Sequence, residues 1–347
     1  MLVSTSPCGL YCAAGNFYID PWRPVDRAVI THAHSDHARW GSARYLCAAP
    51  GLAPLRARMA PDAAIEALPY GETIDIGGVR VSLHPAGHVL GSSQVRIEHR
   101  GEVWVVSGDY KLDADPTCAP FEAVRCHTFI SESTFGLPIY RWQAPGSLAE
   151  SINRWWRANA EAKRASLIFA YAFGKAQRIL ASVDASIGPI LVHGAVETLN
   201  RAYREAGVAL PTTQLVADLD RASFDPAGAL VIAPPSAQST PWLRRFGDYS
   251  DAFASGWMAI RGARRQRAVD QGFTLSDHAD WPSLNRAIAE TGAERVYVTH
   301  GQVATMVRWL TERGVDAHPM KTEFEGEAGI EEGMAPPPPE TPAPAPE

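Results

Sequence analysis

The chain has 347 residues, of which 46% are hydrophobic and 20% are charged, and a formal net charge of −6. This length suits one large domain or two ordinary ones with a sizeable core. No run of about 18 apolar residues is present, which argues against a membrane helix, and the first 20 residues suggest no signal peptide. The five scattered cysteines favour a reducing cytoplasm over a disulfide framework.

The negative charge comes from the C-terminal end. Seven acidic residues and no basic residue follow Lys321, and the rest of the chain holds 32 basic and 31 acidic residues. That part is near neutral, so bulk charge does not exclude a polyanionic partner. Residues 331–347 are acidic and rich in proline, which predicts a disordered tail.

Three regions follow one another along the chain. Up to about residue 135, short apolar runs end at glycine-containing turns, which predicts strands that include 27–34 and 126–134. Helical spacing over 147–164 then introduces strand–helix pairs over 166–183 and 188–207, with further short strands at 228–235 and 256–262. After Gly272 we expect helices over 283–292 and 302–314 around a strand at 295–301. Alternating strands and helices predict a mixed α/β protein with a parallel sheet in the middle region.

The stretch ITHAHSDHARW places His32 and His34 just after a predicted strand. Because residues i and i+2 of an extended backbone point the same way, both imidazoles can face one metal ion. Asp36 and His37 can face a neighbouring ion. A surface loop that happens to be rich in histidine is the alternative.

Three further candidate ligands follow strand-like segments. They are His88 in HPAGHVLGS, Asp109 in VWVVSGDY and His300 in RVYVTHG. Alone, each histidine could be an ordinary core or surface residue, and the aspartate could cap a turn. Together with the histidine cluster they suit two divalent ions, with Asp109 as a bridging carboxylate. A water held between the ions would be ionised near neutral pH and would be the nucleophile.

The motif THAHSDH resembles the His-x-His-x-Asp-His motif of the metallo-β-lactamase fold, an αββα sandwich with metals at one edge of its two sheets. The resemblance implies a first metal site formed by His32, His34, His88 and Asp109. It implies a second site formed by Asp36, His37, Asp109 and His300. Asp20, in FYIDPW, matches the aspartate that orients the metal loop; without that match it reads equally well as a turn residue before Pro21.

About 190 residues separate Asp109 from His300, and the predicted α/β region fills that gap. This layout resembles the β-CASP nucleases, in which an α/β cap domain is inserted into the lactamase fold. The resemblance implies a lactamase domain formed by residues 1–140 and 272–330, with a cap domain at 141–271. The segments SEST and SDHAD resemble family motifs that supply Glu132 and His278, and FGKAQR resembles the start of a cap helix.

The opening NFYIDPWRPVDRAVITHAHSDHARWGS is most similar to bacterial ligase-associated DNA exonucleases, which are related to Artemis-type repair nucleases. This implies single-stranded or end-bearing DNA as the substrate, and a functional link to an ATP-dependent DNA ligase and a helicase. RNA-processing β-CASP nucleases share every motif quoted. A small-molecule hydrolase would leave the insert, Glu132 and His278 unexplained, and a non-enzymatic scaffold does not need a complete ligand set.

We therefore expect Asp20, Asp36, Glu132 and His278 to be the catalytic residues beside the metal ligands. His278 as imidazolium would stabilise or protonate the leaving oxygen, and Glu132 would orient it and raise its pKa. In the alternative, His278 only binds phosphate. The nitrogen–oxygen ligand set favours zinc and admits manganese.

The candidate substrate-binding residues are basic. Arg261, Arg264, Arg265 and Arg267 crowd one short segment and could grip phosphates, although a solvated turn is nearly as good an interpretation. Lys175 begins a predicted helix and could bind a terminal phosphate.

Overall fold

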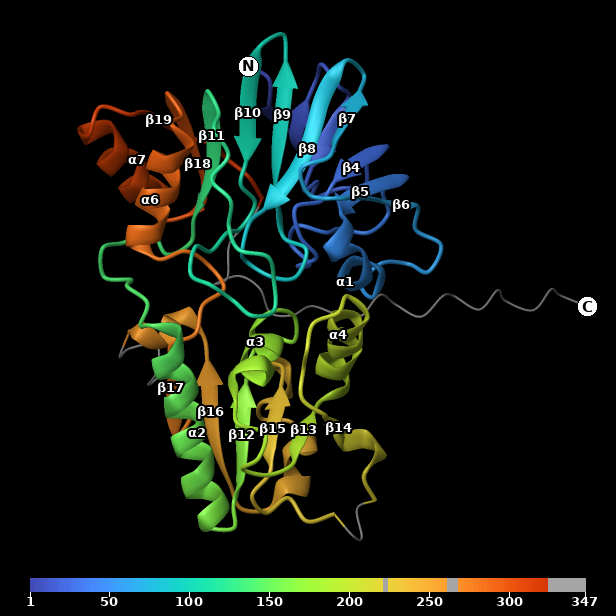
Figure 1. Ribbon diagram of the computed structural model, residues 1–347, viewed down its shortest axis with the longest axis vertical. Coiled ribbons are helices and arrows are strands. Elements are labelled where there is room, and N and C mark those ends of the chain that lie inside the picture. The colour runs from blue at the N-terminus through green and yellow to red at the C-terminus, as the bar shows by residue number, and fades with distance from the viewer. Residues whose placement is uncertain (221–223, 261–267, 324–347) are drawn as a thin grey trace, which may run out of the picture.

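A computed structural model describes residues 1–220, 224–260 and 268–323 (Figure 1). The predicted tail at 331–347 and the arginines Arg261, Arg264, Arg265 and Arg267 lie outside the described residues. The described residues form a mixed α/β structure, as the sequence pattern predicted, and their strands are arranged in three sheets.

The first sheet has the order β1-β2-β3-β4-β5-β6. β2 pairs antiparallel with both β1 and β3, whereas β3, β4, β5 and β6 pair with one another in parallel. The short helix α1 (Leu52–Arg56) lies between β5 and β6 in the chain. The strand bounds are β1 Ser4–Ser6, β2 Gly9–Cys12, β3 Phe17–Ile19, β4 Arg27–Val29, β5 Arg44–Ala48 and β6 Ile65–Leu68.

The second sheet has the order β19-β18-β11-β10-β9-β8-β7. Its strands are β7 Thr73–Ile76, β8 Val79–Pro85, β9 Ser93–His99, β10 Glu102–Val106, β11 Thr128–Ser133, β18 Arg295–Gly301 and β19 Asp316–Pro319. β11 pairs in parallel with β18 over residues 128–133, so the C-terminal segment returns to a sheet begun before residue 134. This pairing brings the end of β18 beside the loop after β10.

The first two sheets pack face to face over an apolar core. Leu10, Ile19 and Val29 of the first sheet meet Val81 and Ile97 of the second. The opposite face of the second sheet is covered by α6 (Trp281–Thr291) and α7 (Val303–Glu312), which bury Leu284 and Met306 against it. Apolar residues that alternate along the strands produce this layering, because successive side chains point to opposite faces.

The third sheet is entirely parallel, with the order β14-β13-β15-β12-β16-β17. Its strands are β12 Ala165–Phe169, β13 Ile190–Val192, β14 Gln214–Leu215, β15 Leu230–Ala233, β16 Tyr249–Ala254 and β17 Gln271–Phe273. Three helices cover one face: α2 (Pro145–Glu161), α3 (Lys175–Ser182) and α4 (Gly194–Glu205). The unit lies below the first two sheets in Figure 1.

One continuous core joins the third sheet's helical face to the outer face of the first sheet. It contains Ala28, Tyr45 and Leu55 from the first sheet and α1, together with Ile179 and Leu199 from α3 and α4. The histidine loop after β4 therefore lies where the two parts of the molecule pack together.

The prediction of a strand at 256–262 is wrong for residues 256–260, which are the part that the structure describes. Gly256–Ala259 is a 3-10 helix, begun by the Ser255 side chain, which accepts a hydrogen bond from the backbone N–H of Trp257. A Cβ on Gly256 would lie 2.4 Å from the Phe135 ring, so glycine allows this turn to pack closely. The strand in this region is β16, which ends at Ala254.

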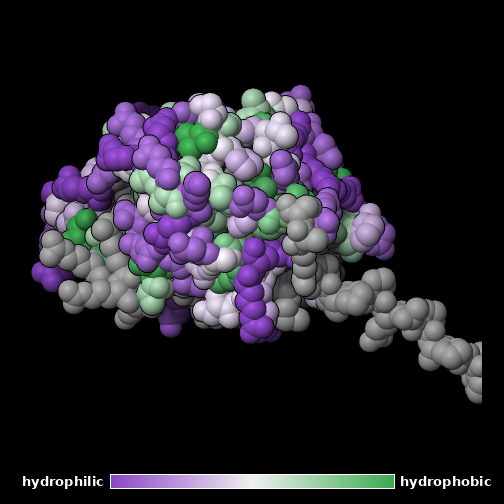
Figure 2. All heavy atoms as spheres, turned by 90° about the horizontal axis from the view of Figure 1, so that it is seen from below, coloured by the Kyte–Doolittle hydropathy of each residue, from purple (hydrophilic) through white to green (hydrophobic). Residues whose placement is uncertain are grey.

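The visible surface is mixed in character. Figure 2 views the molecule from the end that carries the third sheet, and hydrophilic side chains are interspersed there with small hydrophobic patches. Within the described ranges, no helix combines the length and hydropathy needed to cross a membrane.

Candidate active site

The histidine loop is tied down directly after β4. Asp20 adopts a positive φ of 44° and accepts hydrogen bonds from the backbone N–H (2.7 Å) and the hydroxyl of Thr31. Gly108, with φ of 57°, passes so close that a Cβ there would lie 2.7 Å from Thr31. Asp20 and Gly108 thus fix the start of the loop against the end of β10.

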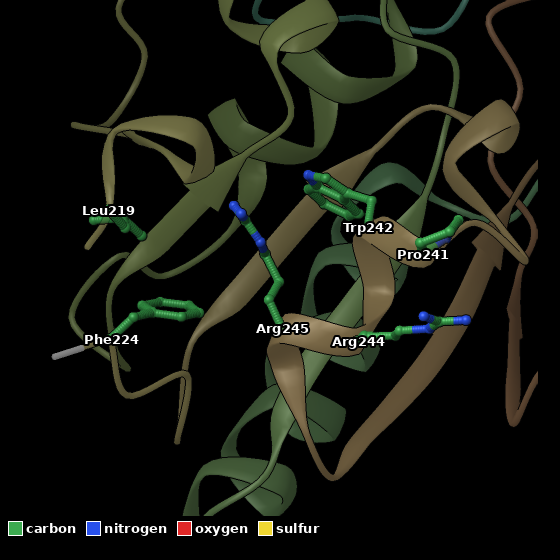
Figure 3. A pocket seen from close by; sticks show the side chains of 6 residues that line it. All are labelled: Leu219, Phe224, Pro241, Trp242, Arg244 and Arg245. Atoms are coloured by element: carbon green, nitrogen blue, oxygen red, sulfur yellow. The ribbon is translucent and has the colours of Figure 1, made fainter. Parts of the chain in front are cut away.

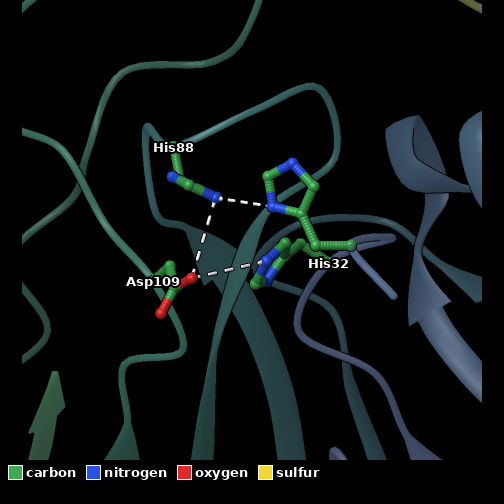
Figure 4. Close-up of side chains that lie close together, drawn as sticks. His32, His88 and Asp109 are labelled. Atoms are coloured by element: carbon green, nitrogen blue, oxygen red, sulfur yellow. Dashed lines mark hydrogen bonds and ion pairs between the residues drawn. The ribbon is translucent and has the colours of Figure 1, made fainter. Parts of the chain in front are cut away.

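His32, His34, His88 and Asp109 form one group that could hold a metal ion. Figure 4 shows His32 and His88 converging on Asp109. The Nε2 atoms of His32 and His88 lie 3.6 and 3.8 Å from Asp109 Oδ2, and His34 Nδ1 lies 3.0 Å from His88 Nε2.

His37, Asp109 and His300 form a second group. Asp109 Oδ1 lies 3.1 Å from His300 Nε2, while Asp109 Oδ2 lies 3.4 Å from His37 Nε2. Asp36 adjoins this group, with Oδ2 3.6 Å from His37 Nε2. His37 Nδ1 donates to Asp20 Oδ2 at 2.7 Å, a contact that fixes the orientation of that imidazole. Asp109 thus touches both groups.

The donor atoms fit a metal ion. His32 Nε2 and Asp36 Oδ1 are buried and have no hydrogen-bond partner among the described residues, and burial of such atoms is costly unless something binds them. Burial, helped by neighbouring positive charge, lowers the pKa of His32, His34 and His88, so these imidazoles are neutral and able to donate lone pairs.

Negative charge is concentrated on Asp109 and its surroundings. Although burial opposes it, the charges of His37 and His278 hold the pKa of the Asp109 carboxyl well below its usual range. Burial would lower the pKa of His37, but the nearby carboxylates Asp109 and Asp36 raise it well above its ordinary value. A cation bound here would replace the proton of the His37 imidazolium as the positive charge beside these carboxylates.

Glu132 and His278 form a third group with Asp109. His278 Nδ1 lies 3.0 Å from both oxygens of Glu132 and 3.9 Å from Asp109 Oδ2. Burial opposes ionisation of Glu132, but the charge of His278 dominates and lowers its pKa. The motifs at 131–134 and 276–280 therefore meet beside the two metal groups.

Lys175 does not present its ammonium to solvent. It is only 1% exposed, and its Nζ lies 3.2 Å from Asp277 Oδ2, which is equally buried. The charge of Lys175 offsets burial and lowers the pKa of Asp277. A terminal phosphate would have to displace Asp277 from this pair.

Two contacts at the site were not predicted from the sequence. The carbonyl of Phe173 lies 3.2 Å from His34 Nε2, and the carbonyl of Asp277 lies 2.8 Å from His88 Nδ1. Asp277 lies inside the quoted SDHAD motif, beside His278, and this position in the motif could have indicated that it lies at the site. A backbone carbonyl has no sequence signature, so Phe173 could not have been found.

A separate pocket of about 590 Å³ lies on the third-sheet unit. Its lining residues are Leu219, Phe224, Pro241, Trp242, Arg244 and Arg245. In Figure 3 the Arg245 side chain extends between Phe224 and Trp242, while Arg244 points away from them. None of these residues belongs to the three groups around Asp109, so this pocket is distinct from the histidine cluster.

No family model matches the sequence. A protein of Opitutus terrae named probable DNA ligase is 31% identical over 325 residues, which cover 93% of this chain and 31% of that protein. Endoribonuclease YSH1 of Gibberella zeae is 33% identical over 129 residues, or 35% of this chain and 14% of its own length. Transcription termination factor FttA of Pyrococcus abyssi is 31% identical over 157 residues, or 40% of this chain and 24% of its own length.

This chain thus spans about a third or less of each of these relatives. Among solved structures, a protein of unknown function from Enterococcus faecalis V583 superposes with a TM-score of 0.58 at 12% identity. The match covers 87% of this chain and 80% of that one, so the two share a fold.

Proposed function

We propose that this chain, a relative of the β-CASP nucleases with the metallo-β-lactamase fold, is a metal-dependent nuclease that hydrolyses DNA phosphodiester bonds from strand ends. In this proposal residues 1–140 and 272–330 form the lactamase unit, an αββα sandwich, and residues 141–271 form the cap. The return of β18 to the second sheet and the separate third sheet support that division.

The observation that carries the proposal is the convergence of three groups on Asp109. Two of them, with His32, His34 and His88 or with His37 and His300, suit metal ions, and the third is the Glu132–His278 pair. A single-metal or small-molecule hydrolase gives no role to a buried acid–imidazole pair beside the metal groups. Hydrolysis of a polynucleotide gives such a pair a role, because it can protonate the leaving oxygen or bind the phosphate.

Two divalent ions, zinc or manganese, would be held by His32, His34, His88 and Asp109 and by Asp36, His37, Asp109 and His300. When bound, they supply charge neutralisation for the phosphate and a nucleophilic water at neutral pH. Asp20 keeps His37 in the tautomer that is protonated on Nδ1, because the Asp20 carboxylate accepts that proton.

In this proposal His278 acts on the leaving group. Its Nδ1 donates to Glu132, and Glu132 Oε1 is itself fixed by the backbone N–H of Tyr110 at 2.9 Å. Nε2 of His278 is then the atom that donates a proton or hydrogen bond to the departing oxygen. The Glu132 charge favours the imidazolium form that this step requires.

DNA is favoured over RNA by the relative named probable DNA ligase, which is similar over 93% of this chain. That likeness also supports a functional link to strand joining. RNA remains the second candidate substrate, because the relatives named endoribonuclease YSH1 match about a third of the chain.

The test is digestion of matched single-stranded DNA and RNA oligonucleotides labelled at either end, with zinc or manganese restored to chelator-treated protein. We expect progressive shortening of DNA from one end and little loss of RNA. Preferential cleavage of RNA would replace the DNA assignment with the second candidate. A lack of metal-dependent cleavage of either polymer would overturn the nuclease proposal.

A further inference from the structure

We propose that the segment Phe173–Lys175 of the third-sheet unit, acting with Asp277, positions the metal ligands His34 and His88. Metal affinity would then depend on how this unit is seated on the histidine loop. The inference rests on the proposed function, because it assumes that His34 and His88 bind a metal ion.

Two backbone carbonyls determine which nitrogen of each imidazole carries a proton. A carbonyl oxygen can only accept, so Phe173 O, 3.2 Å from His34 Nε2, requires a proton on that nitrogen. Asp277 O, 2.8 Å from His88 Nδ1, requires one there. A neutral imidazole has one N–H, so His34 Nδ1 and His88 Nε2 both carry lone pairs.

These two lone pairs face each other. His34 Nδ1 and His88 Nε2 are 3.0 Å apart, and with these tautomers no proton lies between them. Two acceptors at this distance repel each other, and a cation bound by both relieves the repulsion. The carbonyls of Phe173 and Asp277 thus aim both imidazoles at one ion, which is the usual role of the partners behind metal-binding histidines.

A buried ion pair fixes the positions of the two carbonyls relative to each other. Lys175 Nζ lies 3.2 Å from Asp277 Oδ2, and both side chains are 1% exposed. Arg178 adds a second link across the same boundary, since its Nη1 donates to the Ser276 carbonyl at 2.7 Å. The segment that carries Phe173 O is therefore anchored to the segment that carries Asp277 O.

Gly174 makes this close approach sterically feasible. Its φ is 89°, and a Cβ there would lie 2.5 Å from Val89 and 3.0 Å from the Asp277 carboxylate. Its backbone N–H donates to Gln177 Oε1 at 2.9 Å, which fixes the turn into α3. An alanine at 174 would push the Phe173 carbonyl away from His34.

The first test reads the tautomers without metal or activity. The metal-free protein, labelled with ¹⁵N in its histidines, is examined by long-range ¹H–¹⁵N correlation, with His34→Asn and His88→Asn variants for assignment. We expect His34 to be protonated on Nε2 and His88 on Nδ1. The opposite tautomer at either residue would overturn the inference.

The second test measures zinc and cobalt dissociation constants by competition with a chromogenic chelator. Gly174→Ala is compared with Gly207→Ala, a matched control in the same unit, because Gly207 also has a positive φ (84°) but has no described neighbour within 4 Å of its Cβ position. We expect about 10- to 100-fold weaker metal binding for Gly174→Ala and an unchanged constant for Gly207→Ala.

Lys175→Met and Asp277→Asn should each weaken metal binding and alter the visible absorption bands of bound cobalt, while the double variant should recover part of the loss. Equal metal affinity in all folded variants, with only thermal stability reduced, would show a purely structural pair and overturn the inference while leaving the proposed function intact. A wild-type protein that binds no divalent metal would overturn both.

Discussion

Nδ1 of His278 lies 3.0 Å from both carboxylate oxygens of Glu132, although 146 residues separate the two in the sequence. Both side chains are buried, and Trp142 Nε1 donates to the His278 carbonyl at 2.8 Å. The imidazole is therefore held by its ring and by its backbone.

His278→Ala should lower kcat by about 10²- to 10⁴-fold, the usual contribution of a general acid or base. The measurement is single-turnover cleavage of labelled single-stranded DNA, with metal content determined by mass spectrometry on the same sample. Unchanged metal content is expected, because His278 is proposed to act on the leaving group. A variant that loses its metals would contradict that division of roles.

Glu132→Gln should lower kcat by at least about tenfold, because an amide no longer favours the imidazolium form of His278. KM should change little, since Glu132 is buried behind the imidazole. Kinetics at several pH values check this, with His278→Ala/Glu132→Gln as the control. If Glu132 acts through His278, the double variant should be no slower than His278→Ala alone.

Asp109→Asn should abolish binding of at least one metal ion. Asp109 lies within 3.9 Å of His32, His37, His88, His278 and His300, and it is the only carboxylate that belongs to all three described groups. Metal content per chain, measured after dialysis, should fall together with activity. Full retention of two ions would rule out a bridging role.

Asp20→Asn should weaken metal binding by about 10- to 100-fold, because Asp20 orients His37 and ties the loop through Thr31. Asp26→Asn is the control, since Asp26 is exposed and pairs only weakly with Arg44 at 3.2 Å. Chelator competition should separate the two variants. Equal affinities would mean that Asp20 does not orient the ligand.

The buried ammonium of Lys111 provides a test of how stability depends on pH. Burial, together with the charge of Arg178, lowers the pKa of Lys111 to about 8. Between pH 8 and the unfolded value near 10.4 the unfolded chain binds more protons, so stability should rise with pH. The free energy of unfolding should gain about 3 kcal/mol relative to Lys111→Met across this window. If the free energy of unfolding changed equally with pH in the two metal-free proteins, the result would contradict the shifted pKa.

The sequence was informative where chemistry needs particular side chains. Histidines at 32, 34 and 37 follow a short strand, and His88, Asp109 and His300 follow others, so their meeting could be expected from the resemblance. The α/β pattern of the middle region was equally readable, because apolar runs alternate with helical spacing there. The α/β expectation required only local patterns, whereas the expected ligand set also required the resemblance to the metallo-β-lactamase fold.

Other features depend on three-dimensional packing that local patterns do not encode. The segment 256–262 has the apolar content of a strand, but Ser255 and the Phe135 ring turn its start into a 3-10 helix. Lys175 resembles a phosphate ligand in sequence, yet Asp277, about 100 residues away, neutralises it. The contact of Phe173 O with His34 involves a backbone atom, which no residue pattern can reveal.

The most direct test of the two-metal nuclease is cleavage of end-labelled single-stranded DNA by chelator-treated protein, before and after zinc or manganese is restored, beside Asp109→Asn. We predict no cleavage without metal, progressive shortening once the ions are restored, and none by the variant under either condition. Equal cleavage by metal-free protein, or by Asp109→Asn, would contradict the account.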